Sequence, residues 1–511
     1  MRLTHGLHRG LQQYPDALAT IDGERVRTWR ESENRVARLA AGLRMLGLSS
    51  GERVAILALN SDAYHECQLA AAWAGAVFVP VNTRWSMPEV AFTLRDSGAR
   101  VLLVDDYFVP LVEDLRAEGA CPETVLYAGP EPVPAGLLAV EGLIAENRPM
   151  QDAERGGAEL AAIYYTGGTT GRAKGVMLSH ASMISSALTS FASGAYVAPG
   201  ARYLHAAPMF HSADASGWVA VNALGGTHVF LPRFTPGGAA EAIQRYRVTD
   251  TIMVPTMIRL LIDSPEAAGA DLSSLQRLIY GGSPIDGTVL ARARERLHGT
   301  AFTQAYAMTE MSPVMTLLTP ADHHVSRLRD SAGRAVPHVD IRIADDYGSA
   351  PAGTIGEILA RGGGQMLGYW NRPDETKAAL DGGWMRTGDS GYLSGDGYLF
   401  VVDRIKDMII SGGENVYSAE VENALASHSA VAASAVIGVG DQVWGEHVHA
   451  VVVLADGASI SAEELRAYVK TRIAAYKAPR TIQFAESLPL SGAGKVLKQQ
   501  LRDEYRAKQE L

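Results

Sequence analysis

Strand-length apolar runs alternate with helix-length patterns along the chain, and this alternation is what most constrains the fold. Residues 51–60 (GERVAILALN) predict a buried strand, Ala63–Ala74 a helix and Val77–Val81 a second strand. The alternation returns at residues 250–282 in DTIMVP, TMIRLLIDS and LQRLIYGG. Strands separated by helices favour parallel sheets with helices on both faces, so the sequence predicts an α/β fold.

The pattern changes close to residue 403, where a charged break at Asp403–Asp407 separates two apolar runs. The segments that follow read as a mixture of strands and helices in a unit of ordinary domain size. We therefore predict a large N-terminal domain of stacked α/β subdomains with parallel-rich sheets at residues 1–402. Residues 403–407 are the predicted hinge, and residues 408–511 the predicted small, mobile C-terminal α+β domain.

Composition narrows the class of protein and its partners. A hydrophobic content of 47% with 20% charged residues is typical of a soluble globular enzyme. The net charge of −10 argues against a nucleic-acid partner. Cys67 and Cys121 lack metal-ligand spacing, so neither a structural zinc site nor a disulfide framework is expected.

The sequence also bears on location and assembly. The first residues lack the apolar core of a signal peptide, and the longest apolar stretch, Ala70–Val81, is too short to span a bilayer. We expect a cytoplasmic protein without an integral membrane segment. The oligomeric state is open, with a homodimer as one expectation.

The segment YYTGGTTGRAKG, Tyr164–Gly175, has the chemistry of a phosphate-binding loop. Glycines let backbone N–H groups converge on an anion, threonines add hydroxyl donors, and Lys174 adds a charge suited to phosphate. The loop is not a Walker loop, because Ala173 precedes the lysine and Gly175 follows it. No dinucleotide fingerprint and no GxSxG elbow with a credible triad occur elsewhere.

This loop resembles the signature loop of the adenylate-forming superfamily, which includes acyl-CoA and aryl-CoA ligases, luciferases and the adenylation domains of peptide synthetases. Further motifs of that family follow in the family's order. They are PMFH (Pro208–His211), YGGSP (Tyr280–Pro284), QAYAMTE (Gln304–Glu310), GWMRTGD (Gly383–Asp389), VDRIKDMIISGGENVYSAEVE (Val402–Glu422) and PLSGAGKVLK (Pro489–Lys498).

The resemblance implies a two-step reaction with ATP, Mg²⁺ and CoA. A carboxylic acid and ATP would give an acyl-adenylate and pyrophosphate, and CoA would then displace AMP to give acyl-CoA. Because both reactants of the first step are anions, the protein must supply positive charge and orientation rather than a nucleophile.

By resemblance, ATP and AMP would be bound by residues from most of these motifs. Thr309 would bond the α-phosphate, Glu310 would hold Mg²⁺, and Tyr306 would stack on adenine. Lys495 would bridge the carboxylate and the α-phosphate. The implied nucleotide-binding set is Thr166, Gly167, Gly168, Thr169, Thr170, Gly171, Lys174, Gly281, Gly282, Ser283, Gln304, Ala305, Tyr306, Ala307, Met308, Thr309, Asp389, Arg404 and Lys495.

The second step implies further roles. Rotation of the small domain about Lys406 would bring Ser411, Gly412 and Gly413 to the pantetheine tunnel. His211 would act as a gate near the carboxylate. The catalytic set is therefore Lys495, Glu310, Thr309, Lys174 and His211, and the expected acyl pocket contains Met209, His211, Trp218, Met257 and Met311.

The acid itself is not fixed by these motifs. The apolar character of the expected pocket favours a medium- or long-chain fatty acid, while an aromatic acid of the 4-coumarate, ferulate or benzoate type is the alternative. A carrier-protein-dependent adenylation enzyme is a further alternative. An amino-acid-loading module would carry an aspartate at the His211 position, whereas here Asp214 lies three residues later.

Two readings outside the ligases remain. A nucleotide-sensing relic is disfavoured because Lys174, Glu310, Asp389 and Lys495 are all present, and a luciferase-like oxygenase is the other alternative. One departure from the family pattern is Ser418, which stands where proline is usual.

Overall fold

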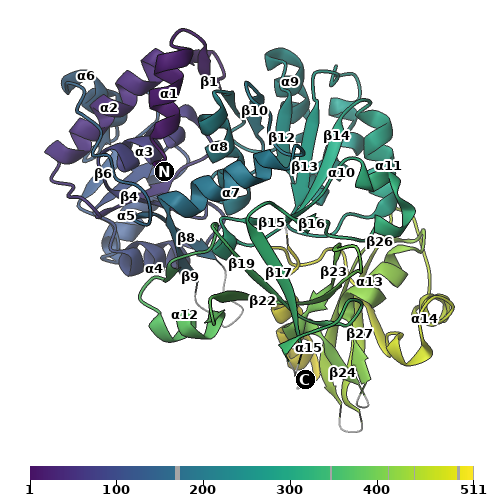
Figure 1. Ribbon diagram of the computed structural model, residues 1–511. Coiled ribbons are helices and arrows are strands. Elements are labelled where there is room, and N and C mark those ends of the chain that lie inside the picture. The colour runs from purple at the N-terminus through teal and green to yellow at the C-terminus, as the bar shows by residue number, and fades with distance from the viewer. Residues whose placement is uncertain (167–172, 346–347, 412–413, 442–443, 492–494, 510–511) are drawn as a thin grey trace. The chain divides into compact units, whose positions relative to one another are not determined.

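The computed structural model describes residues 1–166, 173–345, 348–411, 414–441, 444–491 and 495–509 (Figure 1). Contacts divide the chain into two compact units, which are described separately below. The first is formed by Met1–Asp340 and Arg361–Met385, and the second by Ile341–Ala360 and Arg386–Leu511.

The first unit contains two sheets whose neighbouring strands are mostly parallel, as the alternating pattern predicts. One sheet has the order β20 (Gly368–Tyr369), β9 (Lys174–Ser179), β8 (Leu160–Thr166), β4 (Val77–Pro80), β3 (Arg53–Leu57), β5 (Val101–Val104), β6 (Thr124–Tyr127) and β7 (Leu138–Ala139). The other has the order β16 (Arg334–Ala335), β15 (Val314–Leu318), β14 (Ala301–Ala307), β13 (Arg277–Gly281), β12 (Asp250–Met253), β10 (Arg202–His205), β11 (Thr227–Phe230), β1 (Leu18–Asp22) and β2 (Arg25–Thr28).

Helices connect these strands, and local sequence explains where they begin. Helix α2 (Trp29–Met45) starts at a capping box in which Thr28 and Glu31 bond each other's backbone N–H groups. Helix α3 (Asp62–Trp73), capped by Ser61, is buried along its whole length and packs against α2. The other helices of this unit are α1 (His5–Gln13), α4 (Met87–Ser97), α5 (Val109–Ala117), α6 (Val140–Glu146), α7 (His180–Ala192), α8 (Ser212–Leu224), α9 (Pro236–Tyr246), α10 (Pro255–Asp263), α11 (Gly287–Arg296) and α12 (Pro373–Ala379).

The second unit starts earlier in the chain than the predicted boundary at residue 402. Strand β22 (Trp384–Leu393) pairs antiparallel with β23 (Leu399–Arg404), which ties residues before the predicted hinge to those that follow it. Their sheet has the order β18 (Gly348–Ser349), β17 (Val339–Asp345), β19 (Gly356–Gly362), β22 and β21 (Leu380–Asp381), with β23 on β22. The hinge itself concerns motion and stays a prediction.

The C-terminal segment of the second unit forms a smaller sheet with its own apolar core. The strand order is β25 (Glu414–Val416), β24 (Ile409–Ser411), β27 (Gly445–Leu454) and β26 (Val431–Asp441), with β28 (Thr481–Phe484) beside β27. Its helices are α13 (Ser418–Ala426), α14 (Ala462–Lys470) and α15 (Lys498–Gln509). Helix α14 ends at Lys470, and directly after it the Thr471 hydroxyl donates to the Tyr468 carbonyl at 2.7 Å.

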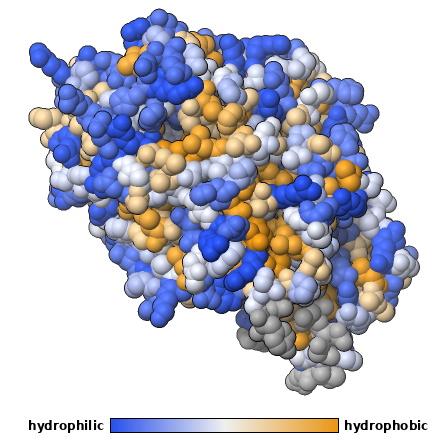
Figure 2. Space-filling view, in the orientation of Figure 1, coloured by the Kyte–Doolittle hydropathy of each residue, from blue (hydrophilic) through white to orange (hydrophobic). Residues whose placement is uncertain are grey.

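Among the residues described, no helix combines the length and apolar character needed to cross a bilayer. On the face shown in Figure 2, hydrophilic residues are interspersed with apolar ones, as is normal for a folded protein.

Candidate active site

The two ends of the predicted phosphate loop are held together by strand pairing in the first unit. Strands β8 and β9 are antiparallel, and Thr166 lies opposite Lys174. The intervening predicted residues Gly167, Gly168, Thr169, Thr170 and Gly171 lie outside the described part of the chain. Lys174 is therefore fixed at the start of β9, immediately after the loop.

A segment from far along the chain lies against β9. Strand β20 pairs with it antiparallel, so that Tyr369 is opposite Val176, and the N–H of Trp370 donates to the Gly175 carbonyl at 2.7 Å. This pairing brings Tyr369 next to the phosphate loop. The sequence motifs did not single out Tyr369.

Lys174 contacts two groups from this segment. Its ammonium lies 5.2 Å from the centre of the Tyr369 ring and forms an ion pair with Glu375 in the first turn of α12. A cation over an aromatic face is attracted by the ring's negative face.

Tyr369 also connects to Glu310, the predicted Mg²⁺ ligand. Its hydroxyl donates to Glu310 Oε1 at 2.8 Å, and the Met366 N–H donates to the Glu310 carbonyl at 2.8 Å. Burial, followed by the charge of Glu310, raises the pKa of Tyr369, so its hydroxyl stays a neutral donor. Lys174, Tyr369 and Glu310 thus form one contiguous group.

Thr309 lies beside Glu310 in a short 3₁₀ turn (Thr309–Met311) and contacts a second group that sequence reasoning missed. Its hydroxyl is 2.8 Å from the hydroxyl of Ser212, the first residue of α8. His211, directly before Ser212, caps α8, and its Nδ1 accepts the Ala213 N–H at 3.2 Å. Strand β14 and helix α8 therefore bring Thr309 and His211 into one neighbourhood.

The YGGSP segment begins in the last two residues of β13, which is parallel to β14. A Cβ atom on Gly281 would lie 2.3 Å from the Ala305 carbonyl oxygen, and Gly282 has a positive φ of 81°. Both glycines are therefore required by the fold itself, in addition to their predicted role in nucleotide binding. Ser283 follows them, Gln304–Ala307 lie on β14 opposite β15, and the Met308 N–H bonds the Pro313 carbonyl at 2.9 Å.

Asp214 is buried in the core of the first unit and is hydrogen-bonded there. Its Oδ2 lies 2.6 Å from His205 Nδ1, and the Tyr203 hydroxyl donates to Oδ1 at 3.3 Å. The Asp214 carboxylate is therefore part of a buried hydrogen-bond network, and the His211 position carries no carboxylate.

The predicted acyl-pocket residues other than His211 are also core residues. Met209, Trp218, Met257 and Met311 are all buried. Trp218 Nε1 donates to His65 Nδ1 at 2.9 Å, and Met257 belongs to the cluster beneath β12 and β13. Their burial is what core filling requires, and their role in substrate binding stays a prediction.

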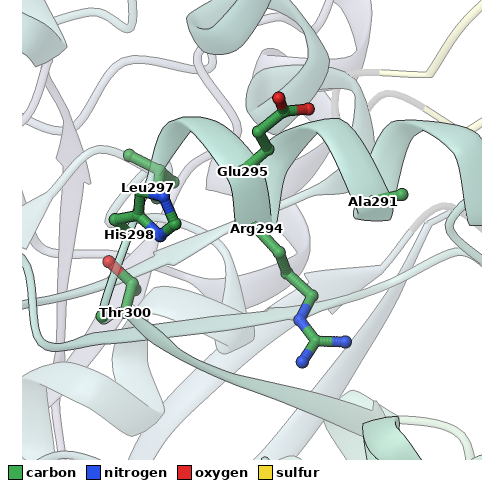
Figure 3. A pocket seen from close by; sticks show the side chains of 7 residues that line it. Ala291, Arg294, Glu295, Leu297, His298 and Thr300 are labelled. Carbon is green, nitrogen blue, oxygen red and sulfur yellow. The ribbon is translucent and has the colours of Figure 1, made fainter.

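A hollow of about 550 Å³ lies elsewhere, at the C-terminal end of α11 (Figure 3). It is lined by Ala291, Arg294, Glu295, Leu297, His298, Gly299 and Thr300. None of its lining residues belongs to the predicted site.

In the second unit, strand pairing brings two of the predicted nucleotide-binding residues together. Asp389 on β22 is opposite Arg404 at the end of β23, and Arg404 Nε lies 2.8 Å from Asp389 Oδ1. The bond to arginine fixes the orientation of the carboxylate. A carboxylate has further lone pairs with which it can accept hydrogen bonds from other donors.

The remaining predicted residues are spread along the second unit. Lys495 is exposed, and its backbone N–H donates to Ser491 Oγ at 3.1 Å. Lys406 lies in the turn Ile405–Asp407 between β23 and β24, and Ser411 is the last residue of β24. Gly412 and Gly413 lie outside the described residues.

Comparisons with known proteins identify the family. The model described as "AMP-binding enzyme" matches residues 7–370, and its C-terminal domain model matches residues 420–495. The chain belongs to the AMP-binding enzyme family. The prediction made from the motifs is thereby confirmed, and the chain is an adenylate-forming enzyme of the CoA-synthetase type, an AMP-forming acid–thiol ligase.

Relatives within the AMP-binding family cover nearly the whole chain. A feruloyl-CoA synthase of Amycolatopsis sp. is 42% identical over 97% of this chain and 98% of its own. The long-chain-fatty-acid–CoA ligase FadD13 of Mycobacterium tuberculosis is 37% identical over 92% of this chain and 91% of its own. The structure of the amide bond synthetase McbA from Marinactinospora thermotolerans matches with a TM-score of 0.89 at 32% identity, covering 98% of this chain and 99% of that one.

Proposed function

We propose that this enzyme is an aryl-CoA synthetase that activates a cinnamate-type acid with ATP and transfers it to CoA. The observation that carries the choice of acid is the feruloyl-CoA synthase relative, which is 42% identical over 98% of its length. The sequence alone favoured a fatty acid, and we reverse that order because the fatty-acid relative is less similar, at 37%.

A medium- or long-chain fatty acid is the second candidate. FadD13 supports it, as does the apolar character of Met209, Met257 and Met311. Methionine adapts to many apolar shapes and is also a common core residue, so these side chains favour no particular chain length.

The first unit would bind the phosphates. Lys174 and Thr166 flank the loop and would bind the β- and γ-phosphates, while Thr309 would donate to the α-phosphate. These groups offset the repulsion between a carboxylate and ATP, which is the main obstacle to adenylation.

Glu310 suits a magnesium ion of the kind shared with a nucleotide. Among the described residues, no three histidine, cysteine or acidic side chains gather as a metal site. Mg²⁺ commonly takes one or two carboxylates and completes its shell with waters and substrate phosphates, and a single carboxylate held by Tyr369 fits that mode. The ion would supply neutralisation of phosphate charge.

The second unit would bind the ribose and supply the mobile lysine. Asp389 and Arg404 would contact the ribose hydroxyls, and Lys495 would stabilise charge that develops at the α-phosphorus. In the second step Lys406 would be the pivot, with Ser411, Gly412 and Gly413 at the pantetheine.

The loading of an amino acid onto a carrier protein is less favoured. That function needs an anionic side chain directed at the substrate's ammonium group. Asp214 is instead bonded to His205 and Tyr203 in the core.

The proposal is tested by assaying AMP and pyrophosphate formation with ferulate, 4-coumarate, benzoate and fatty acids of several lengths. Each acid is assayed with CoA, with an amine acceptor and with neither. We expect CoA-dependent turnover to be fastest with a cinnamate-type acid. A preference for fatty acids would select the second candidate, and turnover with amines but not with CoA would contradict the proposal.

Lys495→Ala tests the role of the mobile lysine. We expect this variant to lose adenylation by about 10²- to 10³-fold, because one transition-state contact is removed. Thioester formation from preformed acyl-AMP should be retained. Equal loss of both half-reactions, measured separately in single-turnover assays, would contradict the assigned role.

A further inference from the structure

The loop lysine of the first unit is already paired with an acidic residue. Lys174 forms an ion pair with Glu375, and Arg372 Nε lies 3.9 Å from the other oxygen of the same carboxylate. The lysine side chain is 25% exposed and the glutamate side chain 38% exposed. The ammonium that a terminal phosphate would need is thus held by an internal anion.

Local hydrogen bonds fix the backbone turn that carries Glu375. The Tyr369 N–H donates to Thr376 Oγ1 at 2.8 Å, and the Thr376 hydroxyl donates to the Arg372 carbonyl at 2.8 Å. These bonds attach the first turn of α12 to β20, and β20 is paired with β9 beside Lys174. The backbone that carries Glu375 is therefore attached to the strand pair beside Lys174, where the carboxylate pairs with the lysine.

We propose that Glu375 is an internal counter-ion that competes with the terminal phosphates of ATP, and with pyrophosphate, for Lys174. This inference rests on the proposed function, since it assumes that the loop binds those phosphates. Glu375 is a positioning residue, because it acts on the nucleotide through Lys174.

Two consequences follow from the charges. A triphosphate that binds the loop must displace the Glu375 carboxylate, so the ion pair weakens ATP and pyrophosphate binding. When pyrophosphate leaves, Glu375 can bind Lys174 again, which favours product release. AMP lacks the terminal phosphates, so its affinity should not depend on Glu375.

The test measures dissociation constants of pyrophosphate and AMP by calorimetry for wild type and Glu375→Gln. Partly exposed ion pairs are weak, so we expect Glu375→Gln to bind pyrophosphate about two- to five-fold more tightly. AMP binding should be unchanged. In steady-state assays KM for ATP should fall, while kcat stays the same or falls if pyrophosphate release limits turnover.

The neighbouring Asp374 provides a matched control. It is exposed in the same turn of α12, so Asp374→Asn removes the same charge without breaking the contact to Lys174. If Asp374→Asn and Glu375→Gln increase the affinity for pyrophosphate equally, the effect comes from the loss of one negative charge and not from the contact with Lys174. That result would overturn the proposal. Lower thermal stability together with weaker AMP binding in Glu375→Gln would indicate a structural role and also overturn it.

A double variant separates this inference from the proposed function. Lys174→Ala should weaken pyrophosphate binding, and adding Glu375→Gln to it should then have no further effect. If Lys174→Ala weakens pyrophosphate binding but Glu375→Gln alone does not change it, the counter-ion proposal fails. The proposed binding of phosphates by the loop is then still supported. If Lys174→Ala leaves pyrophosphate affinity unchanged, the assigned role of the loop lysine fails and the counter-ion proposal falls with it.

Discussion

Three histidines, His65, His205 and His228, are buried together in the first unit, and the hydrogen bond of His65 depends on its protonation state. His205 Nε2 lies 2.8 Å from His228 Nδ1, and the rings of His65 and His228 are 4.5 Å apart. His65 Nδ1 accepts the Trp218 N–H, which requires that nitrogen to be unprotonated. Burial, with a smaller effect of His205, lowers the pKa of His65 to about 3.

This arrangement predicts acid-sensitive stability. A histidine whose folded pKa is lowered contributes stability above its unfolded pKa of about 6.5, and that stability is lost as the pH falls. Between pH 6.5 and pH 5 the loss should be about 2 kcal/mol for His65. His65→Gln keeps an acceptor but does not titrate, so urea unfolding followed by circular dichroism should show a smaller pH dependence.

The exposed His5 is the control for that measurement. The pH dependence of the unfolding free energy should be smaller in His65→Gln than in His5→Gln, which removes an exposed imidazole. An unaltered dependence in His65→Gln would show that His65 is not a neutral buried residue.

Sequence reasoning at this scale found the residues that carry motifs and missed their partners. Lys174, Thr309 and Glu310 could be predicted because each belongs to a recognisable local pattern. Tyr369 and Glu375 could not, because they reach Lys174 only through the pairing of β20 with β9. That pairing joins segments almost two hundred residues apart and leaves no local signal.

At the scale of elements, one acidic side chain organises the start of α13 in the second unit. Asp403 accepts hydrogen bonds from the N–H and hydroxyl of Ser418, and from the Ala419 N–H at 3.4 Å. Lys498 at the start of α15 donates to the Ser418 hydroxyl at 2.5 Å. Proline, the usual residue in place of Ser418, would lack the N–H that Asp403 binds.

Asp403→Ala should therefore destabilise the second unit. Loss of an acidic cap costs about 0.5–2 kcal/mol, and faster amide hydrogen exchange is expected at Ser418 and Ala419. Asp456→Ala, which removes an exposed carboxylate from the same unit, is the control and should leave exchange unchanged. Equal exchange rates in both variants would contradict the capping role.

Elements with a strong apolar pattern were predicted well, and elements set by pairing were not. The expected helix at Ala63–Ala74 appears as α3, shifted by one residue, and the expected strand at Val77–Val81 appears as β4, which ends one residue earlier. Two-residue strands such as β20 and β21 have no periodicity to detect. The second unit also contains Ile341–Ala360 and the residues from Arg386 onward, which precede the predicted boundary, and that boundary stays a prediction.

At the scale of the whole molecule, the proposed chemistry draws on residues from both units. Lys174, Thr309 and Glu310 belong to the first, whereas Asp389, Arg404 and Lys495 belong to the second. The α/β class with parallel-rich sheets was predictable from the alternating pattern. The family was predictable from motif order, whereas the choice of acid depends on the shape of a pocket that no motif encodes.

The most direct test of the account follows oxygen from the acid into the nucleotide. If the carboxylate attacks the α-phosphorus, thiol attack later breaks the bond between acyl carbon and phosphate oxygen, so AMP keeps one carboxylate oxygen. Ferulate, or the acid found most active, is labelled with ¹⁸O at both carboxylate positions, and AMP is analysed by mass spectrometry. We predict one ¹⁸O atom in each AMP formed with acyl-CoA, and unlabelled AMP would contradict the acyl-adenylate pathway.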